Sequence, residues 1–97
     1  MRKGTTSTGF TFEFDENRLD DMRFVDILAE VVDPETHPFR RITCTSQLLT
    51  MMLGEDMKKA LYAHIGKAHE GRVPKAEIQK ALDEIMSAAG EDAEKNL

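Results

Sequence analysis

The chain has 97 residues, enough for one compact domain around one hydrophobic core. Its 18 acidic and 13 basic residues give a formal net charge of −5, which disfavours binding to nucleic-acid phosphates. A single cysteine, Cys44, excludes an intramolecular disulfide, and no apolar run approaches the roughly 20 residues of a membrane-spanning helix. We therefore expect a cytoplasmic protein that binds neither nucleic acid nor membrane.

The N-terminal region joins a polar segment to a short aromatic one. Residues 1–7 contain no apolar residue after Met1, so we expect a flexible N-terminus. Next, Phe10, Phe12 and Phe14 alternate with Thr and Glu, which predicts a strand within residues 8–14 with one buried face. A lone strand leaves backbone groups unpaired, so its partner is either another segment of the chain or a second copy in a homo-oligomer.

Helical spacing of apolar residues begins after this strand. Asp20 is the predicted N-cap of a helix over residues 22–32. The apolar residues that form its buried face are Phe24, Ile27, Leu28 and Val31. Residues 33–42 contain two prolines, which predicts a connection between helices, held to the core by Phe39 and Ile42.

A second and a third helix are expected after this connection. Thr43 or Thr45 caps the second helix, which continues through residues 47–53 and is ended by Gly54 in the left-handed conformation. The third helix is expected over residues 55–68, because two acidic residues stand at its start, where the helix dipole favours them.

The fourth helix has the clearest amphipathic pattern in the chain. It is expected to begin at Val73-Pro74 and to end at Gly90, leaving residues 91–97 as a charged flexible tail. These patterns predict a mostly α fold of about four helices in one compact domain, residues 8–90, with a short N-terminal β-strand.

The three histidines lack the spacing of a metal site. His64 and His69 are five residues apart, so they do not share one helix face, and His37 lies in the proline-containing connection. Exposed or helix-capping roles are therefore favoured for all three. We expect no metal and no cofactor.

Cys44 is the one candidate nucleophile. Arg40 and Arg41 precede it and would lower the pKa of its thiol, whereas a buried and unreactive cysteine is the favoured interpretation. The sequence offers no base or orienting group beside it, so we expect that the protein is not an enzyme.

The most apolar part of the chain is the second predicted helix together with the start of the third. Two interpretations are open: packing in the core, or an adaptable apolar surface that holds a segment of a partner protein. The candidate partner-binding residues are Leu48, Leu49, Met51, Met52, Met57 and Tyr62.

Four stretches of the sequence resemble the tail assembly chaperones of long-tailed (siphovirus-type) phages and prophages. They are, in order, TGFTFEFDENRLDDMRFVDILAEV, LLTMMLGEDMKKALYAHI, EGRVPKAEIQKALDEIMSAAG and GEDAEKN. The resemblance extends over residues 8–97, and its specificity comes from order and spacing rather than from a single motif. The connection at residues 33–42 is more basic and proline-rich than this family leads us to expect.

The resemblance implies a largely helical protein that binds the tape measure protein, keeps it soluble and promotes tail tube assembly around it. It also implies that a longer form, made by a ribosomal frameshift, binds the tail tube protein. Such a protein works in the cytoplasm of the bacterial host and is absent from the mature virion. The alternative function is a small helical DNA-binding regulator or another phage adaptor protein, although the third and fourth predicted helices lack the basic surface of a recognition helix.

Overall fold

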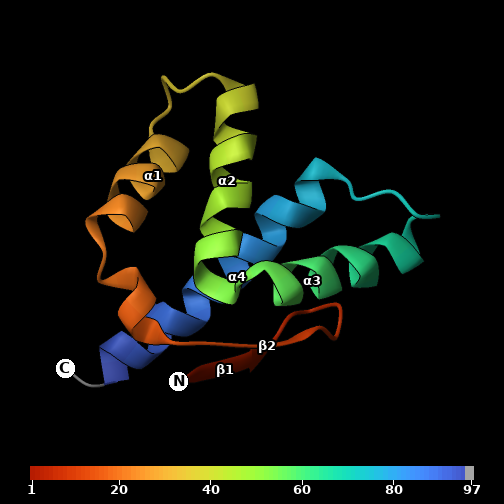
Figure 1. Cartoon of the computed structure of the whole chain (residues 1–97), viewed down its shortest axis with the longest axis horizontal. Helices are drawn as coiled ribbons and strands as arrows, with labels where there is room; N and C mark the ends of the chain where they lie inside the picture. The colour runs from red at the N-terminus through yellow and green to blue at the C-terminus, as the bar shows by residue number, and fades with distance from the viewer. Residues whose placement is uncertain (96–97) are drawn as a thin grey trace.

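Along residues 1–95, two strands, one short 3₁₀-helix and four α-helices follow one another (Figure 1). A computed structural model describes the backbone of these residues and the side chains of residues 1–88. The elements are β1 (Arg2–Thr5), β2 (Thr11–Phe14), η1 (Glu16–Leu19), α1 (Met22–Val32), α2 (Pro38–Leu53), α3 (Glu55–Ala68) and α4 (Lys75–Lys95). The predicted mostly α fold with an N-terminal strand is therefore confirmed.

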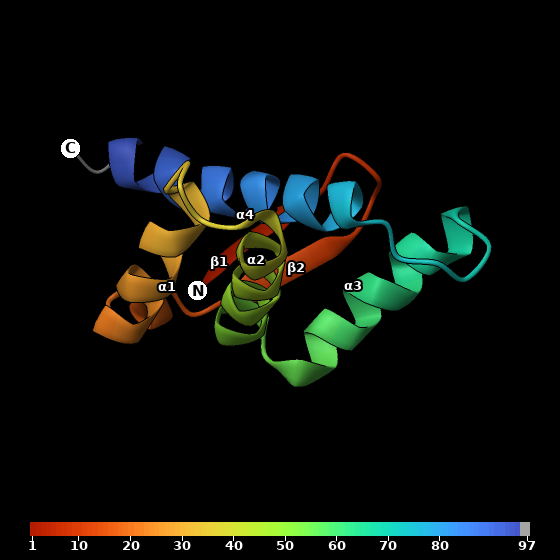
Figure 2. The same cartoon turned by 90° about the horizontal axis from the view of Figure 1, so that it is seen from above.

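Helix α2 lies at the centre of the fold. It contacts α1, α3, α4 and strand β2, and Figure 2 shows α1 and α3 on opposite sides of it. Apolar residues surround most of the circumference of its second half, as an element buried between several neighbours requires. The other helices and the hairpin each use one apolar face to pack towards this centre.

The strand partner lies within the chain, in the segment that the sequence predicts to be flexible. That prediction is wrong for residues 2–5, which form β1 and pair antiparallel with β2, so that Arg2 lies opposite Phe14 and Gly4 opposite Phe12. Backbone pairing needs no apolar side chain, which is why the polar composition of this segment concealed it. Gly4 leaves room for the aromatic ring, because a Cβ atom there would lie 2.6 Å from Cζ of Phe12.

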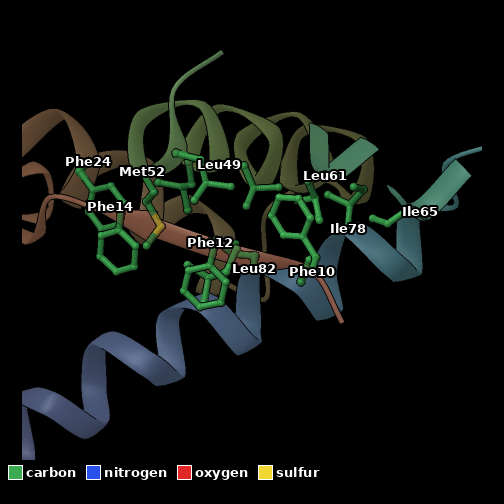
Figure 3. Close-up of a cluster of buried hydrophobic side chains, with 14 residues drawn as sticks. Phe10, Phe12, Phe14, Phe24, Leu49, Met52, Leu61, Ile65, Ile78 and Leu82 are labelled. Carbon is green, nitrogen blue, oxygen red and sulfur yellow. The ribbon is translucent and has the colours of Figure 1, made fainter. Parts of the chain in front are cut away.

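The core consists of one face of the hairpin and the inner faces of the helices. Figure 3 shows Phe10, Phe12 and Phe14 in a row, with side chains of α2 and α4 around them. The rings of Phe12 and Phe14 are stacked at 6.3 Å between centroids. The buried apolar side chains are Phe10, Phe12, Phe14, Phe24, Leu48, Leu49, Met52, Leu53, Leu61, Ile65, Ile78, Ala81, Leu82 and Ile85.

Helices α1 and α3 have the predicted bounds, with a change of one residue at the first cap. Asp21, rather than the predicted Asp20, caps α1, and its carboxylate accepts the backbone N–H of Arg23 at 2.9 Å. Gly54 joins α2 to α3 with a φ of 84°, the positive value that a glycine tolerates most readily. Its ψ of 166° is extended, so the predicted left-handed conformation is met in φ only.

Helix α2 begins several residues before its predicted start. Pro38 occupies the first turn, and Nδ1 of His37 accepts the N–H of Phe39 at 3.1 Å, which caps the helix. Thr43 and Thr45, the predicted caps, instead donate their hydroxyl hydrogens to the carbonyls of Arg40 and Arg41. Because Thr hydroxyl groups can donate hydrogen bonds to carbonyls inside a helix, the presence of these residues alone does not mark the start of α2.

Helix α4 extends beyond its predicted end. The sequence places a stop at Gly90 and a flexible tail from residue 91, whereas the helix continues to Lys95. A glycine inside a helix costs only about 1 kcal/mol relative to alanine, and the following Glu, Ala and Lys residues favour helix. Residues 96 and 97 of the predicted tail lie outside the described residues.

Replacing Phe14 by alanine is expected to lower the free energy of unfolding by about 3–5 kcal/mol, since truncating a buried Phe leaves a cavity in the core. Urea denaturation followed by circular dichroism measures this change. The matched control is Thr11→Ala on the exposed face of the same strand, which should change stability by less than about 0.5 kcal/mol. Equal effects of the two substitutions would show that the hairpin does not pack on the helices.

Candidate functional site

Three of the six candidate partner-binding residues lie in the core. Leu48, Leu49 and Met52 have no exposed surface, because they project from the centre of α2 towards the hairpin and α4. A partner could reach them only if the domain opened. For these three residues the structure shows core packing, the alternative interpretation, and it leaves no exposed surface for a partner.

The other three candidates are half-buried at the margin of the core. Met51, Met57 and Tyr62 pack against the buried cluster and keep part of their side chains at the surface. Tyr62 lies beside α2, where its hydroxyl is 3.2 Å from Oγ of Ser46. Tyr62 also borders a concave apolar surface.

This surface lies where the first half of α2 meets α3 and the start of α4. Two adjoining hollows of about 220 and 190 Å³ share Ile42 and Lys75 in their walls. We call them together the Phe39 groove, which is lined by Pro38, Phe39, Ile42, Thr43, Ser46, Tyr62, Val73, Lys75, Ile78 and Gln79. Both hollows are open to solvent, so the groove can receive a segment of chain without rearrangement of the fold.

Phe39 is the dominant apolar group of the groove. The sequence predicted that it holds a connection to the core, yet 70% of its surface is exposed. The reason is the early start of α2, which places Phe39 in the first turn of a helix and on its outward side. The His37-Pro38 pair was the signal that could have located it, since proline favours the first turn of a helix.

Two lysines border the aromatic groups of this region. Nζ of Lys75 lies 5.8 Å from the ring centroid of Phe39, and Nζ of Lys58 lies 5.5 Å from that of Tyr62. Cations over aromatic faces are attracted by the ring quadrupole. Lys75 is exposed, whereas Nζ of Lys58 also donates a hydrogen bond to the Thr50 hydroxyl at 2.9 Å. The groove therefore combines apolar surface with local positive charge in a protein of net negative charge.

Cys44 is a buried free cysteine, the placement that the sequence favours. Its side chain is buried, and Sγ donates a hydrogen bond to a carboxylate oxygen of Glu30 at 3.0 Å. Burial raises the pKa of the thiol and the Glu30 carboxylate raises it further, whereas Arg40 acts in the opposite direction. The same hydrogen bond and the Arg40 guanidinium lower the pKa of Glu30.

The histidines make structural contacts. His37 caps α2, His69 ends α3, and Nε2 of His64 lies 3.1 Å from the carbonyl oxygen of Thr8 in the hairpin loop. Within the described part of the chain, no three His, Cys, Asp or Glu side chains gather closely enough to hold a metal ion. No helix among the same residues has the length and apolar character needed to cross a bilayer.

Comparison with known proteins finds no family model, no curated protein and no solved structure that matches this chain. The Phe39 groove is therefore the structural observation from which a function can be proposed.

The Cys44 thiol is expected to react with a disulfide reagent at pH 8 at least ~10-fold more slowly in the folded protein than in urea, since burial limits access and raises its pKa. Absorbance of the released thiolate measures the rate. Glu30→Gln should react faster than the unmodified protein, because it removes a charge that opposes the thiolate. A folded protein that reacts as fast as the unfolded chain would contradict the buried placement.

Proposed function

We propose that this protein is a phage tail assembly chaperone that binds the tape measure protein through the Phe39 groove. The observation that carries the proposal is an open apolar groove, with Lys75 in its wall, on a chain whose four stretches resemble that family in order and spacing. In this function the protein keeps the tape measure protein soluble in the cytoplasm of the bacterial host and promotes tail tube assembly around it. It is then absent from the mature virion.

The physical requirements of such a chaperone support the proposal. A protein that keeps an apolar partner in solution needs exposed apolar surface for binding and enough net charge to stay soluble itself. Phe39 in the groove supplies the exposed apolar surface, and the net charge of −5 favours solubility of the protein itself. Lys75 and Lys58 favour segments in which acidic residues stand next to apolar ones.

Recruitment of the tail tube protein belongs to the same proposal. The family implies that a frameshifted longer form carries the additional segment that binds the tube protein. Helix α4 continues to Lys95, so an added segment would leave the domain from the end of this helix. The short form would then bind the tape measure protein alone.

Phe39→Ser is expected to weaken binding of the tape measure protein by about 10- to 150-fold, because losing the contact of one large apolar side chain costs roughly 1.5–3 kcal/mol. The experiment co-expresses the chain with the very long helical protein encoded just downstream and scores how much of that protein stays soluble and co-elutes. The unmodified chain should raise its solubility, and the variant should not.

The matched control for this experiment is Met22→Ser on α1. Met22 is 67% exposed, close to the value for Phe39, but it lies outside the groove. Equal loss with both variants would show that the groove is not the binding site. A downstream protein that precipitates equally with and without the chain would overturn the proposed function itself.

A further inference from the structure

A second apolar surface lies on the outer side of α1. Met22, Val25, Ala29 and Val32 are separated by three, four and three residues, which places them in one stripe along the helix. All four are exposed, with Met22 at 67%, Val25 at 44% and Val32 at 70%. We call these four residues the α1 stripe.

The α1 stripe is not needed to hold α1 on the fold. A different face of the helix, formed by Phe24, Ile27, Leu28 and Val31, packs against the core. Helix α1 contacts α2 and η1, and Figure 2 shows it at one edge of the molecule. The spacing of the stripe is that of the a and d positions of a coiled coil, the pattern by which one helix packs along another.

The charges beside the stripe are acidic. Asp26 directly follows Val25, at a position that flanks the seam in a two-helix coiled coil, and Asp33 directly follows Val32 as the C-cap of the helix. The side-chain carboxylate of Asp26 makes no ion pair or hydrogen bond with another residue among those that the structure describes. The carboxylate of Asp33 accepts the backbone N–H of Glu35 at 2.9 Å. On the other side, Asp21 is paired with Arg23 at 2.8 Å.

These charges select among the helices that could cover the stripe. In a two-helix seam the flanking residues of one helix lie beside those of the other, and like charges there are unfavourable. A second copy of this chain would bring its own acidic residues against Asp26 and Asp33. A helix with lysine or arginine at the flanking positions would instead form ion pairs.

We propose that α1 docks an amphipathic helix of another protein, one whose apolar seam is flanked by Lys or Arg residues. With 11 residues, α1 is about 16 Å long at about 1.5 Å per residue, so it pairs with roughly three turns of the partner. The α1 stripe and the Phe39 groove share no residue. The proposal is therefore independent of the proposed function.

The test uses two synthetic helical peptides of four heptads with Leu at the a and d positions, one with Lys and the other with Glu at the flanking positions. Fluorescence anisotropy measures their binding to the full chain. The Lys peptide is expected to bind at least ~10-fold more tightly than the Glu peptide, and Val25→Ser is expected to weaken it ~10-fold. Ala63→Ser, at an exposed residue of α3 outside both apolar surfaces, should leave its affinity unchanged.

A second pair of variants separates local pairing from general attraction to an acidic protein. Asp26→Lys and Asp83→Lys change the net charge equally, and both residues are exposed on helices. Asp26→Lys should reduce the preference for the Lys peptide much more than Asp83→Lys does. Circular dichroism confirms that each variant keeps the helical content of the unmodified chain.

Three results would overturn the proposal. The first is equal affinity for the two peptides, and the second is an equal effect of Asp26→Lys and Asp83→Lys. The third is that the chain alone forms a dimer, detected by light scattering, which Val25→Asp converts to a monomer. In that case a second copy of the chain, and not another protein, would cover the α1 stripe. None of these results depends on the tape measure protein, so they are distinct from a failure of the groove.

Discussion

The burial of Phe10, Phe12 and Phe14 is the constraint on which the rest of the fold depends. Their rings lie in a row between α2 and α4 and so join the two longest helices through one shared aromatic layer. Strand β2 can present this row only if its backbone is paired, and β1 supplies the pairing. Thr6 closes the hairpin loop, where its N–H donates to the carbonyl of Phe10.

A local feature of the backbone determines the groove. Because His37 and Pro38 begin α2 early, the helix gains a first turn that stands beyond the core and carries Phe39 into solvent. The start of α4 then brings Lys75 over the ring. A helix that began at Thr43 would have left this segment in a loop, and the hollow would lack its principal apolar wall.

The two exposed apolar surfaces differ in charge, and that difference separates the partners they suit. The Phe39 groove is concave and has Lys75 in its wall, so it favours an apolar segment that carries acidic residues. The α1 stripe is convex and flanked by Asp26 and Asp33, so it favours a basic helix. Opposite charge at the two surfaces reduces competition between their partners for one site.

The sequence by itself determined the helical class, the bounds of α1 and α3, the strand signal of the three Phe residues and the absence of metal-ligand spacing among the histidines. These properties follow from local periodicity and from glycine and proline, which act over a few residues. Only the tertiary structure decided that Leu48, Leu49 and Met52 belong to the core and that Phe39 is exposed. An apolar residue looks the same in the sequence whether it belongs to the core or to a binding surface. The two cases differ only in whether another part of the chain covers the side chain. Strand β1 is a similar case. Its polar residues give no sign of a strand in the sequence, because β1 is held by backbone pairing with β2 and not by its own side chains.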